Sequence, residues 1–85
     1  MIYILKLNGM SVRVLFFGKL VEIAGTSLAV KDVQTTDELV KYLQQGFPQL
    51  AHEKYIIALD KNMIQVNTVL TDGCTVALLP PYSGG

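Results

Sequence analysis

Short apolar runs, separated by polar turn residues, predict the strands of this 85-residue chain. The runs over 12–17 and 74–79 contain one polar residue each, a pattern typical of strands that are covered on both faces. An alternating segment over 27–33 predicts a second strand, which would pair with the first as a hairpin through a short helical turn over 19–24. Weaker apolar runs predict two further strands, over 55–60 and 63–66.

One main helix is predicted between the second and third strands. Thr35 precedes Glu38 by three residues, which is the spacing of a capping box. Gly46 and Pro48 mark the end of the helix. The residues that recur at helical spacing, and that are expected to face the core, are Leu39, Tyr42 and Leu43, with Val40 widening the stripe.

The resulting order of elements, β-β-α-β-β-β, predicts an α+β domain. The two strands that read as covered on both faces, 12–17 and 74–79, fit best side by side in the middle of a sheet. If they run parallel, they need a crossover connection, and the single main helix can supply it. We therefore expect a β-grasp, ubiquitin-like architecture, in which a mixed sheet carries one main helix across one face.

Composition narrows the class of protein. The apolar fraction of 51% and the mean hydropathy of +0.39 exclude a chain that is, as a whole, a disordered acidic or basic tail, and the length suits one small domain. Seven Lys and Arg balance seven Asp and Glu, and the cations are scattered, which argues against nucleic acid as the main partner. No apolar run approaches the roughly 20 residues that cross a bilayer, and the start of the chain lacks the features of a signal peptide. We expect a soluble cytoplasmic protein without a membrane partner.

Side chains that could support catalysis are few. Cys74 is the single cysteine, so an internal disulfide is excluded, and Cys74 and His52 alone cannot form a metal site. We expect His52 to be a solvated surface residue. Because no cation lies beside Cys74 in the sequence, a packed or half-exposed structural thiol is expected there. Three charged residues are expected to serve only in turns: Asp60, Lys61 and Asp72.

The end of the sequence has a different character. Pro80 and Pro81 follow a predicted core strand directly, and because they lack backbone donors the tail should leave the sheet instead of prolonging it. Six residues at roughly 3.3 Å each would reach about 20 Å beyond Leu79. Gly84 and Gly85 have no side chains, so this end could pass through a narrow channel and present its α-carboxylate to another protein. A frayed terminus is the alternative interpretation.

On these features the chain resembles the small subunit of molybdopterin synthase, a MoaD-type sulfur carrier of the ubiquitin-like ThiS-MoaD family. The matching stretches are 12–18, 70–73 and 76–85. The resemblance covers about 11–85, and its most specific part is the last ten residues. The division it implies is an N-terminal extension over 1–9, a β-grasp domain over 10–79 and a flexible Gly-Gly tail over 80–85.

The resemblance implies a carrier that is not itself catalytic and whose chemistry resides at Gly85. In that family, a ubiquitin-activating-like adenylyltransferase uses ATP to adenylate the terminal carboxylate, and a sulfur donor protein converts it to a thiocarboxylate. The large subunit, which holds the catalytic residues, then transfers the sulfur to cyclic pyranopterin monophosphate in molybdenum cofactor biosynthesis. The resemblance implies a heterotetramer and no permanently bound cofactor or metal.

The resemblance also implies which residues meet the partners. The tail residues that would enter a partner are Pro80, Pro81, Tyr82, Ser83 and Gly84. Phe17, Met63 and Leu79 match the positions of an apolar docking surface, with ordinary core packing as the alternative. Two positions depart from the family pattern, because Cys74 stands where an acidic residue is frequent and Asp60 where Asn is common.

Three other functions stay open at this point. A carrier of the same fold could supply sulfur to the thiazole of thiamine or to another acceptor, although the approach to the Gly-Gly end through Leu79, Pro80, Pro81 and Tyr82 favours molybdopterin synthase. The chain could also be a β-grasp interaction module with an unmodified tail. A thiol enzyme that uses Cys74 and His52 is disfavoured, because nothing in the sequence activates either side chain.

Overall fold

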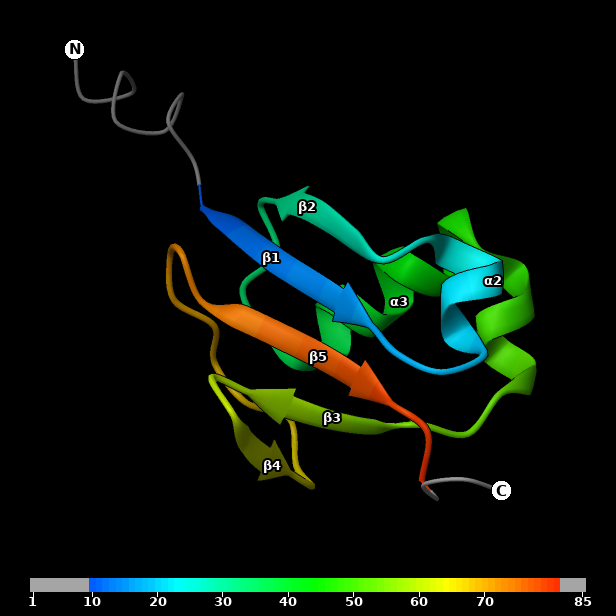
Figure 1. Ribbon diagram of the computed structural model, residues 1–85. Coiled ribbons are helices and arrows are strands. Elements are labelled where there is room, and N and C mark those ends of the chain that lie inside the picture. Colours follow the sequence, from blue (N-terminus) through cyan, green and yellow to red (C-terminus); the bar gives the residue numbers. More distant parts are fainter. Residues whose placement is uncertain (1–9, 82–85) are drawn as a thin grey trace, which may run out of the picture.

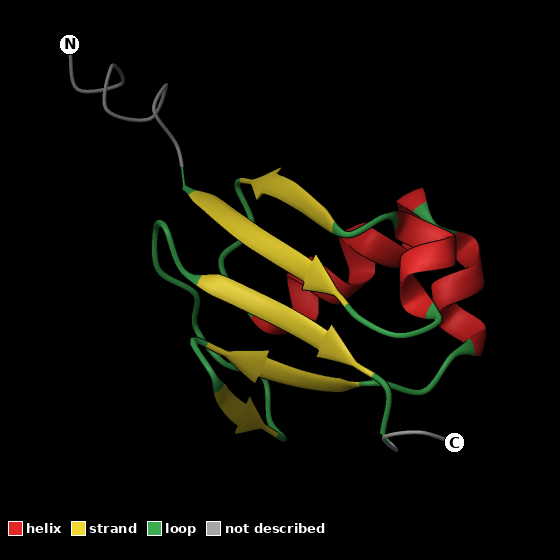
Figure 2. Cartoon of the chain, viewed as in Figure 1, coloured by secondary structure: helices red, strands yellow, loops and turns green. Residues whose placement is uncertain are grey.

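The computed structural model describes residues 10–81, which form one sheet with the helices packed against one of its faces (Figures 1 and 2). The elements in chain order are β1 (Ser11–Phe16), α2 (Leu20–Ala24), β2 (Ser27–Lys31), α3 (Thr36–Gly46), the 3-10 helix η1 (Pro48–His52), β3 (Ile56–Leu59), β4 (Asn62–Ile64) and β5 (Thr75–Leu79). The predicted extension over 1–9 lies outside the described residues. Within 10–81, no helix is both long enough and apolar enough to cross a membrane.

The strand order is β2-β1-β5-β3-β4. β1 and β2 form the predicted antiparallel hairpin, and β1 pairs with β5 in parallel, with Phe16 opposite Leu78. β3 lies antiparallel to both β5 and β4. The first and last strands therefore lie side by side in the centre of a mixed sheet, and in Figures 1 and 2 α3 lies behind them. This arrangement confirms the predicted β-grasp fold.

Alternate residues of the two central strands form the core with the helices. The inward residues of β1 and β5 are each at most 2% exposed: Val12, Val14, Phe16, Val76 and Leu78. They pack against buried side chains from the rest of the chain, namely Leu20, Val30, Val33, Leu39, Leu43, Leu50, Leu70 and Cys74. The packed thiol predicted at Cys74 is therefore confirmed.

The prediction that the central strands are covered on both faces is wrong for the face opposite the helices. On β1, Arg13 is exposed and Leu15 is only half-buried, and on β5 the outward residues Ala77 and Leu79 are also half-buried. The described helices α2, α3 and η1 pack on one side of the sheet, so nothing within 10–81 covers these apolar side chains. Apolar runs cannot distinguish a face covered by the chain itself from one left open.

The start of α3 follows the sequence prediction. The hydroxyl oxygen of Thr35 accepts a hydrogen bond from the Glu38 N–H (3.2 Å). The Glu38 carboxylate in turn accepts one from the N–H of Gln34 (2.8 Å), one residue before the cap. Two donors near the helix start are thereby satisfied by side chains, as in a capping box.

The prediction that Tyr42 faces the core is wrong, since this side chain is 50% exposed. The buried face of α3 is formed by Thr36, Leu39 and Leu43. At about 100° per residue, Tyr42 lies roughly 90° around the helix from the middle of that stripe. Helical spacing from Leu39 alone did not define the centre of the buried face.

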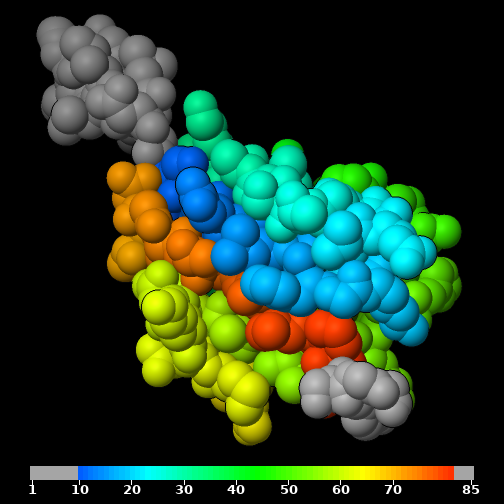
Figure 3. Space-filling model, in the orientation of Figure 1, coloured from blue at the N-terminus to red at the C-terminus, as the bar shows by residue number. Residues whose placement is uncertain are grey.

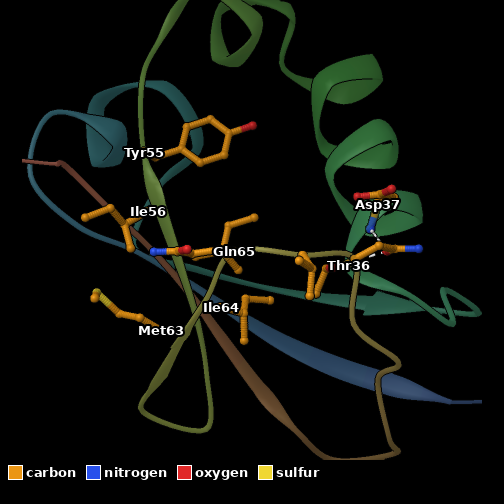
Figure 4. Close-up of a pocket in the computed structure, with 10 residues that line it drawn as sticks. Thr36, Asp37, Tyr55, Ile56, Met63, Ile64 and Gln65 are labelled. Atoms are coloured by element: carbon orange, nitrogen blue, oxygen red, sulfur yellow. Dashed lines mark hydrogen bonds between the residues drawn. The ribbon is translucent and has the colours of Figure 1, made fainter.

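The segment after β4 is tied to the start of α3. The side-chain oxygen of Asn67 accepts hydrogen bonds from the Asp37 N–H (2.8 Å) and from the Thr36 hydroxyl (3.3 Å), drawn as dashed lines in Figure 4. The Thr36 hydroxyl oxygen also accepts from the Thr68 N–H (2.9 Å). Because the chain turns toward the helix here, the strand predicted over 63–66 ends at Ile64. The strand predicted over 27–33 also ends early, before Asp32, which has a φ of 65°.

Candidate functional site

The sheet face opposite α3 carries a row of apolar residues that crosses four strands. By strand register, Leu15 lies beside Ala77, Ala77 beside Ala58, and Ala58 beside Met63. Phe17 extends this face past the end of β1, where its N–H donates to the carbonyl oxygen of Leu78 (3.1 Å). We call this set, together with Leu79, the outer face.

Two of the three predicted docking residues are too exposed to be core residues. Phe17 is 42% exposed and Met63 is 66% exposed, so the core-packing alternative is wrong for both. Leu79 is half-buried, on the surface opposite the buried Leu78. The structure therefore brings Phe17, Met63 and Leu79 together on one open surface, and their role in docking stays a prediction.

The outer face is hollowed. An open depression of ≈ 610 Å³ is lined by Leu15, Phe17, Ala58, Asp60, Lys61, Met63, Thr75, Ala77 and Leu79. Ala58 and Ala77 carry only a methyl group, so the longer side chains around them form the walls of the depression. Nothing in the sequence marks these two alanines, because their placement in the hollow depends on the register between distant strands. Figure 3 shows the packed surface of the molecule from the side on which the strands lie in front.

The polar end of the hollow is the tight turn between β3 and β4. Asp60 and Lys61 both have positive φ (47° and 74°), and they connect the paired residues Leu59 and Asn62. The Asp60 carboxylate accepts a hydrogen bond from the Thr75 N–H (2.9 Å), and its own N–H donates to the carbonyl oxygen of Thr75 (2.8 Å). The predicted turn role of both charged residues is confirmed.

The root of the tail packs against the loop after β1. Gly18 has a φ of +61°, and a Cβ placed on it would lie 2.5 Å from Cγ of Pro80. A residue with a side chain at this position would therefore meet both backbone strain and the proline ring. Pro80 is half-buried and Pro81 is exposed, and β5 ends at Leu79. The remaining predicted tail residues, Tyr82, Ser83, Gly84 and Gly85, lie outside the described residues.

A second hollow, of ≈ 450 Å³, lies around the β4 edge between the strands and the start of α3 (Figure 4). Met63 lines both hollows, and Tyr55, Ile56 and Ile64 also border this one. The titratable groups among its lining residues are one carboxylate, Asp37, and the phenol of Tyr55. The Tyr55 hydroxyl accepts a hydrogen bond from the Gln44 amide (3.1 Å) and points toward the helix in Figure 4. The Thr36 hydroxyl in this lining is hydrogen-bonded to Asn67 and Thr68 and not to Asp37, so no described hydroxyl here is paired with a base.

The remaining chemical candidates of the sequence are not brought together. Cys74 is buried in the core, whereas His52 is exposed on η1, as the sequence predicted. Asp72 serves a turn, because its carboxylate accepts a hydrogen bond from the Ser11 N–H (2.9 Å). Among residues 10–81, no group of three or more His, Cys, Asp and Glu is placed to hold a metal ion.

Comparison with known proteins adds a family to this geometry. The chain matches the model of the ThiS family over residues 14–85. It is similar to a chain in the complex of subunits 1 and 2 of the molybdopterin-converting factor from Helicobacter pylori 26695, with 35% identity, 89% of this chain and 100% of that chain covered, and a TM-score of 0.68.

Two further solved structures share the fold. The small archaeal modifier protein 1 from Methanosarcina acetivorans is 24% identical over 91% of this chain and 98% of that chain, with a TM-score of 0.76. Urm1 from Trypanosoma brucei is 22% identical over 92% of this chain and 98% of that chain, with a TM-score of 0.65. At these identities the likeness concerns the fold alone. The family match over almost the whole sheet and tail confirms the resemblance seen in the sequence, and the chain therefore belongs to the ThiS family, as a small sulfur carrier of the ThiS/MoaD type.

Proposed function

We propose that this carrier is the small subunit of molybdopterin synthase and delivers sulfur through a thiocarboxylate at Gly85. The observation that carries the proposal is the open apolar outer face at the root of the tail, where Phe17 and Leu79 flank the exit through Pro80. The choice of pathway is supported by the 35% identity to a chain in the Helicobacter pylori complex of molybdopterin-converting factor subunits.

The chemistry of the carrier begins at a carboxylate, which is a poor electrophile until one of its oxygens becomes part of a good leaving group. A partner adenylyltransferase would transfer AMP from ATP to the Gly85 carboxylate and release pyrophosphate. A sulfide equivalent from a donor protein would then form a C–S bond at the carbonyl carbon while the C–O bond to AMP breaks. The product is the thiocarboxylate, with AMP as the leaving group.

The chain itself would supply positioning for this reaction. Pro80 and Pro81 restrict the backbone at the exit from β5, so less conformational entropy is lost when a partner orders the tail. Gly84 and Gly85 bring no side chains into a narrow active site. Cys74 has no part in the reaction, because its thiol is buried in the core.

The proposal assigns the catalytic residues to partner proteins. The large subunit would bind the outer face and the tail and would transfer sulfur to cyclic pyranopterin monophosphate. The adenylyltransferase and the sulfur donor would act on the same tail at an earlier stage. We propose a cytoplasmic heterotetramer with the large subunit as the working assembly, without a permanently bound cofactor and without nucleic acid or membrane partners.

The first test is the intact mass of the chain after incubation with ATP, a cognate adenylyltransferase and a sulfur donor. We expect a mass increase equal to the difference between sulfur and oxygen, confined to the C-terminal peptide. A chain that lacks Gly85 should show no increase, and Cys74→Ala should still show it. An unchanged mass, with the enzyme shown to be active on a known carrier, would contradict the proposal.

The second test separates molybdopterin from other acceptors. The thiocarboxylated chain is offered either to a molybdopterin synthase large subunit with cyclic pyranopterin monophosphate, or to a thiazole synthase with its substrates. We expect molybdopterin in the first reaction and no thiazole in the second. Thiazole alone would move the chain to thiamine synthesis, and no charging at all would favour an unmodified interaction module.

A further inference from the structure

The floor of the outer hollow is made by two alanines from different strands. Ala58 of β3 and Ala77 of β5 lie directly opposite each other, and Ala58 is only 7% exposed. In the same row, the flanking positions on β1 and β4 are occupied by Leu15 and Met63. Because a methyl group is much shorter than a leucine or methionine side chain, the centre of the sheet is lower than its borders. The hollow thus results from residue size at specific register positions.

The walls of the hollow are apolar, which indicates what it can bind. Small-molecule sites combine an apolar lining with a few convergent polar groups that orient the ligand. Here the Asp60 carboxylate already accepts a hydrogen bond from the Thr75 N–H, and Lys61 lies in the same exposed turn. An apolar side chain needs no such groups, and burying it against these walls is favourable. The lining therefore fits a bulky aliphatic or aromatic side chain better than a polar metabolite.

The position of the hollow indicates which protein supplies that side chain. Leu79 is a wall residue, and the next residue along the chain, Pro80, begins the tail. Pro80 lies against Gly18, the residue after the second wall residue, Phe17. The tail thus leaves the sheet between two walls of the hollow. A protein that takes up the tail close to its root would lie against this end of the outer face.

We infer that the hollow receives one bulky apolar side chain from the protein that takes up the tail, and that Ala58 and Ala77 set the size of the side chain accepted. The inference rests on the proposed function, because it assigns the occupant to the large synthase subunit. It adds a determinant of specificity, since the alanines select partners by shape whereas the tail carries the reacting group.

The test fills the hollow from its floor. Ala77→Leu and Ala58→Leu place a larger side chain where the partner residue would lie, and Ala77→Ser nearly preserves the size. The matched control is Ala29→Leu, because Ala29 is exposed on the same side of the sheet but lies on β2, opposite Arg13 and outside the hollow. Binding of the full-length chain to its cognate large subunit is measured by calorimetry, after circular dichroism has established that each variant is folded.

We expect binding by Ala77→Leu and Ala58→Leu to weaken by about 10-fold or more, the range in which overpacking of a fitted apolar contact falls. Ala29→Leu should stay within roughly 3-fold of the wild type, as expected of a change outside a packed contact. Ala77→Ser nearly keeps the size of the floor residue and should lose less affinity than Ala77→Leu, its cost being that of a hydroxyl buried in the contact. In NMR spectra of the wild-type complex, the methyl resonances of Ala58 and Ala77 should shift more than that of Ala29.

Three results would overturn the inference, and they differ in what else they remove. If the wild-type chain binds the large subunit and Ala77→Leu binds equally well, the inference fails and the proposed function stands. If the wild-type chain neither binds a large subunit nor becomes thiocarboxylated, the proposed function fails and the inference fails with it. If Ala77→Leu instead abolishes a concentration-dependent dimer while binding to the large subunit persists, the occupant is a second copy of this chain.

Discussion

The two faces of the central strands use neighbouring residues of the same kind for different purposes. Phe16 is 2% exposed and packs edge-on against Phe47, whereas Phe17 is 42% exposed on the outer face. Leu78 is fully buried, and Leu79 borders the hollow. Since side chains alternate across a strand, one residue in each pair is buried in the core and the next lies on the open outer face. If the outer face binds the partner as proposed, stability and recognition are separated by a single step along the backbone.

The open outer face also explains why the two central strands have apolar residues on both sides. A strand that is apolar on both faces normally has elements of its own chain on both sides. Here the helices within 10–81 cover one side, and the other carries the apolar lining of an open hollow. An outer face of this composition is typical of a binding surface. A strand that is apolar on both sides can thus have one side in the core and the other on an open surface.

The largest effects are expected on the inner face. Phe16→Ala should destabilise the domain by about 3–5 kcal/mol and Leu78→Ala by about 2–5 kcal/mol, because each leaves a cavity in a packed core. Phe17→Ala and Leu79→Ala, the matched neighbours, should cost less than about 1 kcal/mol, as is usual for surface positions. Urea denaturation, monitored by circular dichroism, measures the free energy of unfolding of all four variants. Equal losses within either pair would break the comparison between the faces.

For binding to the large subunit, substitutions on the outer face are expected to have the large effects. Phe17→Ala and Leu79→Ala should each weaken the affinity for the large subunit by about 10-fold or more, because apolar residues at the centre of an interface contribute most of its energy. A variant on the exposed side of α3, Tyr42→Ala, serves as the control and should bind normally. Calorimetric titration of the folded variants decides this. Normal binding by both outer-face variants would move the docking surface elsewhere.

A smaller effect on stability is expected where the β4 loop holds the helix. Asn67→Ala removes the acceptor for the Asp37 N–H and the Thr36 hydroxyl, and should cost about 1–2 kcal/mol, as the loss of a helix cap does. Asn62→Ala removes only one exposed bond to the carbonyl oxygen of Asp60 and should cost less than about 0.5 kcal/mol. Thermal denaturation compares the two. A larger loss from Asn62→Ala would show that the turn, and not the helix tether, supports the sheet.

A small effect of the opposite sign, a gain in stability, is expected at the rim of the hollow. Lys61 has a φ of 74° in the β3–β4 turn, so Lys61→Gly should stabilise the domain by about 0.5–1 kcal/mol through relief of left-handed strain. The same substitution at Lys41, which lies within α3, should destabilise it by about 1 kcal/mol. Denaturant midpoints test both signs. If both variants lose stability, the turn is not strained.

The sequence predicted those features that depend on local pattern. The hairpin of β1 and β2 and the Thr35 cap follow from hydrophobic periodicity and from capping residues. The features that it missed depend on contacts between distant segments. Asn67 is an ordinary polar loop residue until the fold places it beside α3.

The candidate site also has some residues that the sequence predicted and others that it did not. Phe17, Met63 and Leu79 are predicted from a family resemblance, and the structure brings them to one hollow. The alanine floor escaped notice, because an alanine in an apolar strand carries no sign of being opposite another alanine. The alanine pair can be identified only once the register of β3 against β5 is known. Shape at a surface is therefore the property least accessible from a single sequence.

The central position of β5 has a consequence for how the domain folds. β5 joins the β1–β2 hairpin to the β3–β4 hairpin, and its parallel partner β1 lies at the opposite end of the described chain. Pairs of such large sequence separation form late, because a long loop must close before the contact is gained. The strand that completes the sheet is also the one that leads into the tail. Only a chain that has finished folding then holds Pro80 beside Gly18, so a partner that requires the root of the tail at this position would distinguish folded from unfolded carriers.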